Sequence, residues 1–197
     1  MASPLADPAL DQLFREARTY QWFDGREVTD EQIQAIWELL KMGPTSLNQL
    51  PARIVWCKSP EAKERLAGHA SEGNKEKVSN APVCAILAMD VEFHEQLDWL
   101  APGLGGRDMF ADKPGLRETS AFRNATLQGG YFILAARALG LDCGPMSGFD
   151  NAAVDADFFA DDPNWKSNFI CSVGYGDPEK LFPRLPRPDF DAFNRLI

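Results

Sequence analysis

The chain has 197 residues, of which 45% are hydrophobic and 25% are charged. This composition is ordinary for a globular protein with a buried core, and it excludes an intrinsically disordered chain. The formal net charge of −9 repels nucleic acid and anionic membranes, so an anionic ligand needs a local cluster of arginine and lysine side chains.

Length and hydropathy predict one cytoplasmic domain. At roughly 150 residues per domain, residues 1–197 are expected to form a single domain. No apolar run approaches the roughly 20 residues of a membrane span. Residues 1–10 lack the basic and apolar regions of a signal peptide. We therefore expect a cytoplasmic protein that binds neither membranes nor nucleic acid.

Hydrophobic periodicity predicts two helices in the first quarter of the chain. Residues 8–19 carry apolar side chains at helical spacing, and a capping-box pattern at Thr29 begins a second helix that ends at Gly43. Apolar, β-branched runs predict strands over residues 52–58 and 81–89. A short charged helix between these two strands indicates a crossover connection.

After the second strand, the sequence predicts a loop, two helices and another strand. These elements are an irregular loop or lid over residues 102–114, a long helix over 118–139, a turn-rich stretch over 141–150, a short helix over 152–159 and a buried strand over 168–174. The proline-rich stretch 177–188 is expected to lie on the domain or on a partner subunit. Helices mixed with three to four strands predict an α+β, three-layer α/β/α domain with a small central sheet.

Cysteines and histidines show no metal-site or catalytic spacing. The four cysteines contain no Cys-x-x-Cys pair and favour buried, unreactive thiols; they are Cys57, Cys84, Cys143 and Cys171. The two histidines, His69 and His94, lie on charged segments and are predicted on solvated helix faces. We therefore expect neither a zinc site nor a Ser-His-Asp triad.

Five polar segments interrupt the apolar elements. They are Arg18-Thr19, Pro44-Thr45-Ser46-Leu47-Asn48, Asn74 with Lys77, Pro145-Met146-Ser147-Gly148, and Arg184-Leu185-Pro186. Taken singly, each has an ordinary explanation as a helix-terminal cation, a turn or a surface charge. Together, in this order, they resemble the motifs of the nitroreductase superfamily of FMN-dependent enzymes.

The resemblance implies a phosphate site built from Arg18, Thr19 and Arg184. A phosphate dianion favours guanidinium and hydroxyl donors, and in an acidic protein these donors must be concentrated locally. The chain departs from the family where Gln21 and Phe182 replace residues that are often cations. The site is therefore expected to use fewer charges than in other members.

The other segments are implied to contact the rest of FMN. The 44–48 loop would contact the ribityl chain and ring, and Asn74 and Lys77 would bind the pyrimidine edge. Lys77 would stabilise the anionic reduced ring. The backbone N–H of the 145–148 turn would face flavin N5. Because the flavin carries out the electron chemistry, no catalytic side chain is expected.

Stretches in the C-terminal half resemble one subgroup of the superfamily, called HadB/RutE. They lie at residues 138–150, 166–168, 173–177 and 184–187. The resemblance implies a homodimer of nitroreductase-like fold, with a small, mostly antiparallel sheet and FMN in the interface. It also implies ping-pong reduction of malonic semialdehyde by NADH or NADPH in pyrimidine degradation.

Two other functions remain open from the sequence. One is a broad-specificity NAD(P)H nitroreductase or quinone reductase, and the other is a flavin-binding redox sensor without catalytic turnover. Four arginines are candidates for binding a substrate carboxylate; they are Arg53, Arg107, Arg117 and Arg123.

Overall fold

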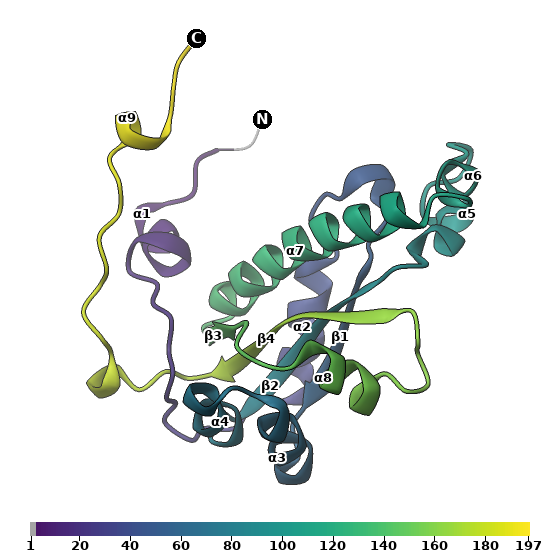
Figure 1. The fold of residues 1–197 in the computed structure, drawn as a ribbon. Coiled ribbons are helices and arrows are strands. Elements are labelled where there is room, and N and C mark those ends of the chain that lie inside the picture. The colour runs from purple at the N-terminus through teal and green to yellow at the C-terminus, as the bar shows by residue number, and fades with distance from the viewer. Residues whose placement is uncertain (1–2) are drawn as a thin grey trace.

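A four-stranded antiparallel sheet forms the centre of the computed structural model, which describes residues 3–197 (Figure 1). In spatial order, the strands are β1 (Ala52–Cys57), β2 (Val83–Asp90), β4 (Trp165–Gly174) and β3 (Asp142–Met146). Each neighbouring pair is antiparallel. All residues of β2 are buried, which explains why this strand is an almost continuous apolar run. The predicted fold class is therefore confirmed.

Helices surround this sheet and differ widely in length. They are α1 (Asp7–Leu10), α2 (Asp30–Leu40), α3 (Pro60–His69), α4 (Glu72–Ser79), α5 (Leu97–Leu100), α6 (Gly106–Phe110), α7 (Pro114–Ala138), α8 (Asn151–Phe158) and α9 (Phe190–Phe193). Short π or 3₁₀ turns occupy residues 11–15, 46–48, 93–96 and 178–180.

Alternating side chains of β2 bind two helical layers to opposite faces of the sheet. Ala85 and Leu87 lie in one core cluster with side chains of α2 and α7. Cys84 and Ile86 lie in a second cluster with side chains of α3, α4 and α8. Because successive strand residues point to opposite faces, this alternation produces the predicted three-layer arrangement.

Local sequence signals set the ends of the long helices. The Thr29 hydroxyl accepts the Gln32 N–H at 3.2 Å, and the Gln32 side chain accepts the Thr29 N–H at 3.0 Å. The predicted capping box is therefore present. Pro114 stands in the first turn of α7, so this helix begins earlier than predicted. Gly140, with φ of +77°, follows the end of α7 as expected.

The helix predicted over residues 8–19 is too long. Helical structure ends at Arg15, and Thr19 instead forms an isolated bridge with Cys143. The Tyr20 N–H donates to the Cys143 carbonyl at 3.1 Å. Backbone pairing with the edge strand β3 therefore overrides the helical periodicity of the last residues.

Other segments differ from their predictions because of tertiary pairing. The first two strands are direct antiparallel neighbours, with Ala52 opposite Met89, so no crossover joins them. The stretch 141–150 contains β3, which pairs with β4, and the expected loop over 102–114 contains α6. Among the described residues, no helix is long and apolar enough to span a bilayer.

All four cysteines are free and buried, as predicted. Burial raises the pKa of Cys57 to about 11 and that of Cys84 to about 12. The Cys57 and Cys84 thiols are therefore protonated and unreactive at neutral pH. The prediction for His94 is wrong, because this residue is only 3% exposed.

Close contact between Gly144 of β3 and the N-terminal segment gives a stability prediction. A Cβ at Gly144 would lie 2.2 Å from the Tyr20 carbonyl oxygen. We expect Gly144→Ala to lower the free energy of unfolding by about 1–3 kcal/mol, because the backbone must move to relieve the clash. Urea denaturation measures this change. Gly68→Ala is the control, since its Cβ meets no atom within 4 Å; equal stability of the two variants would contradict the contact.

Candidate active site

A cavity of about 240 Å³ opens where the edge strand β3 meets α4 and the N-terminal segment. Its lining residues are Thr19, Tyr20, Gln21, Asn74, Lys77, Gly144, Pro145, Met146, Ser147, Gly148 and Ser172. Three of the five predicted segments therefore contribute to one cavity: the N-terminal motif, the Asn74 and Lys77 pair, and the 145–148 turn.

Helix α4 places Asn74 and Lys77 next to the 145–148 turn. The Lys77 ammonium donates to Asn74 Oδ1 at 3.2 Å, and Asn74 Nδ2 donates to the Gly148 carbonyl at 3.1 Å. The Ser71 N–H also donates to this carbonyl, at 2.9 Å. Residues three apart in a helix share a face, so α4 presents both side chains to the cavity.

Close packing of Asn74 and Ser71 against the 145–148 turn requires a glycine at position 148. A Cβ at this position would lie 2.7 Å from both Asn74 Nδ2 and Ser71 Oγ. The backbone N–H groups of Ser147 and Gly148 donate to no protein acceptor within residues 3–197. Two hydrogen-bond donors thus remain available to a ligand at the cavity wall.

The two predicted phosphate-binding arginines lie where the ends of the chain meet. Arg18 donates to the Phe182 carbonyl, and Arg184 donates to the Ala17 carbonyl at 3.2 Å. The Trp22 and Phe182 rings, with centroids 6.0 Å apart, pack across the same two segments. Neither arginine lines the cavity itself, and in the described part of the chain neither forms an ion pair. Both charges remain available for an anion.

Three residues that line the cavity were not predicted from the sequence: Tyr20, Gly144 and Ser172. Burial raises the pKa of Tyr20, and the Asp142 carboxylate adds to the rise. The Tyr20 hydroxyl therefore stays protonated at neutral pH and is able to donate. Ser172 donates to the Lys77 carbonyl at 3.1 Å and ties the end of α4 to β4. The position of Tyr20 directly after Arg18-Thr19 was the only sequence signal for this residue.

A second hollow, of about 360 Å³, continues from the cavity along α7. Its walls include the 145–147 part of the turn and Phe169 of β4. On α7, it is lined by Thr126, Gly129, Gly130 and Ile133. Gly129 and Gly130 place no side chain in this hollow, and a Cβ at Gly129 would lie 2.5 Å from the Phe169 ring.

The 44–48 loop does not reach the cavity of its own chain. It lies against α7, where Asn124 Oδ1 accepts the Ser46 N–H at 2.8 Å and Tyr131 donates to the Pro44 carbonyl at 3.0 Å. Successive helix residues are about 100° apart, so Asn124 and Tyr131 lie on the face of α7 opposite Thr126 and Gly130. The structure therefore separates Pro44, Thr45, Ser46 and Asn48 from the other predicted site residues.

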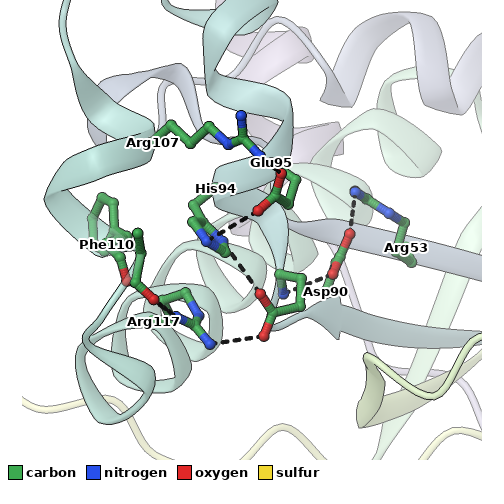
Figure 2. A network of polar contacts seen from close by, with 9 residues as sticks. Arg53, Asp90, His94, Glu95, Arg107, Phe110 and Arg117 are labelled. Atoms are coloured by element: carbon green, nitrogen blue, oxygen red, sulfur yellow. Dashed lines mark hydrogen bonds and ion pairs between the residues drawn. The ribbon is translucent and has the colours of Figure 1, made fainter.

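Three of the four candidate arginines for a substrate carboxylate are already paired (Figure 2). Arg53 binds Asp90 at 2.6 Å, Arg117 binds Glu92 at 2.8 Å, and Arg107 binds Glu95 at 2.5 Å. Arg123 has no ion-pair partner among residues 3–197. Each of the three paired guanidinium groups therefore already neutralises a carboxylate of the same chain.

His94 lies between two carboxylates of the same network (Figure 2). Its Nδ1 is 3.4 Å from Glu92 Oε2, and its Nε2 is 3.5 Å from Glu95 Oε1. Arg117 also donates to the carbonyls of Phe110 and Ala111. These contacts fasten the segment after β2 to the start of α7.

The sequence matches the nitroreductase family over residues 14–175. A protein of Rhodopseudomonas palustris (strain TIE-1), whose name proposes an NADH dehydrogenase or NAD(P)H nitroreductase activity, is 53% identical over 197 residues, 100% of both chains. A Bacillus subtilis structure assigned to the nitroreductases has a TM-score of 0.86 at 22% identity, covering 98% of this chain and 100% of that chain. Another, from Exiguobacterium sibiricum 255-15 in complex with FMN, has a TM-score of 0.83 at 19% identity, covering 99% and 100%.

The chain therefore belongs to the nitroreductase family. The predicted nitroreductase fold is confirmed. The prediction of FMN as cofactor, with NAD(P)H as electron donor, is confirmed at the level of the family.

The residues around the cavity fit FMN. Two unpaired guanidinium groups suit a phosphate, and an ammonium with an amide suits the pyrimidine edge of the ring. The open N–H groups of Ser147 and Gly148 suit a ring nitrogen.

Removing either terminal arginine tests the phosphate site. We expect Arg18→Ala or Arg184→Ala to weaken FMN binding by about 1.5–3 kcal/mol, the range of a charge-assisted hydrogen bond. Titration of the apoprotein, followed by flavin fluorescence, measures this loss. Arg187→Ala is the matched control in the same tail, since Arg187 donates only to neighbouring backbone carbonyls. Wild-type affinity in both test variants would remove these residues from the site.

Proposed function

We propose that this protein is an FMN-dependent NAD(P)H oxidoreductase that reduces malonic semialdehyde to 3-hydroxypropanoate in pyrimidine degradation. The observation that carries the flavoenzyme assignment is the convergence of Thr19, Asn74, Lys77 and the 145–148 turn on one cavity. The resemblance of the turn and its flanks to the HadB/RutE subgroup supports the particular substrate.

Each cavity residue has a distinct binding role in this proposal. Bound FMN supplies the transfer of reducing equivalents from NAD(P)H to the acceptor. Arg18, Thr19 and Arg184 bind the phosphate. Lys77, oriented by its hydrogen bond to Asn74, places positive charge at the pyrimidine edge. The N–H groups of Ser147 and Gly148 orient the reacting side of the ring.

The position of the 44–48 loop supports a homodimer with shared sites. Within one chain, α7 separates this loop from the cavity, so a single copy does not bring the predicted flavin contacts together. A second copy related by two-fold symmetry supplies the loop to each cavity. The C-terminal tail is also suited to a partner, because Phe193 is 78% exposed and Leu196 is 90% exposed.

A broad-specificity nitroreductase or quinone reductase is the second candidate. The hollow beside the 145–147 turn is walled by glycine, Ile133 and Phe169, which suits a flat aromatic acceptor. A redox sensor is the third candidate, and it differs from both enzymes by lacking turnover.

Anaerobic kinetics separate the three candidates. NAD(P)H should bleach the bound flavin, and malonic semialdehyde should restore its absorbance at a higher kcat/KM than nitro or quinone compounds. A higher kcat/KM for nitro or quinone compounds would favour the second candidate. Bleaching without reoxidation by any of these acceptors would favour the sensor.

Lys77 gives a prediction that distinguishes a flavin contact from a surface charge. Reduction adds negative charge to the ring, so an adjacent ammonium stabilises the reduced form more than the oxidised form. Lys77→Met should therefore lower the FMN midpoint potential and slow reduction by NAD(P)H. Asn74→Ala is the comparison, because a neutral amide should affect both redox states more evenly. A spectroelectrochemical titration with an unchanged midpoint in Lys77→Met would contradict the placement of this residue.

A further inference from the structure

The loop between α2 and β1 contains an unusual run of strained backbone. Leu47 and Asn48 each have a φ of +52°, and Leu50 has a φ of +39°. Non-glycine residues rarely adopt this left-handed region, and such strain persists only where the surroundings enforce it. Three instances within four residues therefore require a specific restraint.

Two buried amide side chains supply this restraint by binding the backbone of Ser46. Asn124 Oδ1 accepts the Ser46 N–H at 2.8 Å, and Gln49 Nε2 donates to the Ser46 carbonyl at 2.9 Å. Gln49 is fully buried, and Asn124 is 4% exposed. Buried side chains therefore fix both the backbone N–H and the backbone carbonyl of Ser46.

The two amides are themselves joined through α7. Asn124 Nδ2 donates to the Ser120 carbonyl at 2.9 Å, and the Ser120 hydroxyl donates to Gln49 Oε1 at 3.1 Å. Each amide thus uses both its donor and its acceptor, which fixes its orientation. The network makes the rigid helix a support for the loop.

This support leaves the Ser46 side chain turned outward, whereas Asn48 Nδ2 donates to the Leu100 carbonyl at 2.8 Å. Ser46 and Asn48 are exposed, whereas Gln49 between Asn48 and Leu50 points into the core. Within the described residues, the Ser46 hydroxyl makes no hydrogen bond, while Thr45 Oγ1 already accepts the Leu50 N–H at 3.2 Å. The strained conformation therefore presents Ser46 as an open donor on the outer side of the loop.

We propose that Asn124 and Gln49 are positioning residues that preform the 44–50 loop for the flavin bound by a second copy of the chain. The inference rests on the proposed FMN site shared between subunits. Because the loop is already fixed before binding, ordering it does not reduce FMN affinity. Helix α7 then serves two sites, since its opposite face lines the hollow beside its own 145–147 turn.

Alanine variants of the two amides test the proposal directly. Asn124→Ala and Gln49→Ala should each weaken FMN binding about tenfold or more, the loss expected when a buried hydrogen-bonded restraint is removed. Gln128→Ala is the matched control. Gln128 is also buried on α7, but its Oε1 accepts the Ala52 N–H at 2.9 Å, at the start of β1. This control should lose thermal stability but keep FMN affinity within about threefold.

A glycine rescue separates positioning from general destabilisation. Glycine adopts positive φ without steric cost, so Leu50→Gly in the Asn124→Ala background should recover part of the lost FMN affinity. A merely structural role for Asn124 predicts no recovery. Affinities are compared by apoprotein titration at concentrations where every variant is dimeric.

The outcomes distinguish this inference from the proposed function. Wild-type protein that fails to bind FMN would overturn the proposed function and the inference together. Wild-type binding with unchanged affinity in both amide variants would overturn the inference alone. An equal loss in Gln128→Ala, or no recovery with Leu50→Gly, would also overturn it.

Discussion

Helix α7 separates two segments that the proposed flavin site combines, and the rest of the proposed architecture depends on this separation. The 44–48 loop contacts one face of the helix through Asn124, while the opposite face lines the hollow that adjoins the 145–147 turn. No rotation of side chains brings the loop across the helix. A second subunit is therefore the simplest source of the missing contacts, and the protruding C-terminal tail in Figure 1 is consistent with such a partner.

The acidity of the chain imposes a second constraint. With a formal net charge of −9, the protein must concentrate positive charge where an anionic cofactor binds. The fold brings Arg18 and Arg184 from the two ends of the chain to adjacent segments, which suits the proposed phosphate site. Arginines elsewhere are used differently, since Arg53, Arg107 and Arg117 neutralise nearby carboxylates. Local pairing thus decides which cations remain available.

Local sequence signals predicted the parts of the fold that depend on neighbouring residues. The capping box at Thr29, the long helix ending at Gly140 and the buried thiols were all predictable. The bridge between Thr19 and Cys143 was not, because it depends on an edge strand more than 100 residues away. Helical periodicity alone therefore extended the first helix too far.

In the candidate site as well, some contacts were predictable from the sequence and others were not. The Asn74 and Lys77 pair was predicted through the resemblance to a family motif, and the structure shows that α4 carries both residues. The sequence did not predict that the 44–48 loop lies behind α7, since order along the chain carries no information about which subunit completes a site. The strain at Leu47 and Leu50 was equally hidden, because neither residue type favours positive φ.

Mixed dimers test the shared site most directly. One chain carries Asn74→Ala and Lys77→Met, the other carries Ser46→Ala and Asn48→Ala, and FMN binding is titrated before and after subunit exchange. Sites shared between subunits predict that each mixed dimer regains one intact site, formed by the unmodified cavity of one chain and the unmodified loop of the other. If each site is contained within one chain, both sites of the mixed dimer remain defective. Mixing without recovery of FMN affinity would therefore contradict the account.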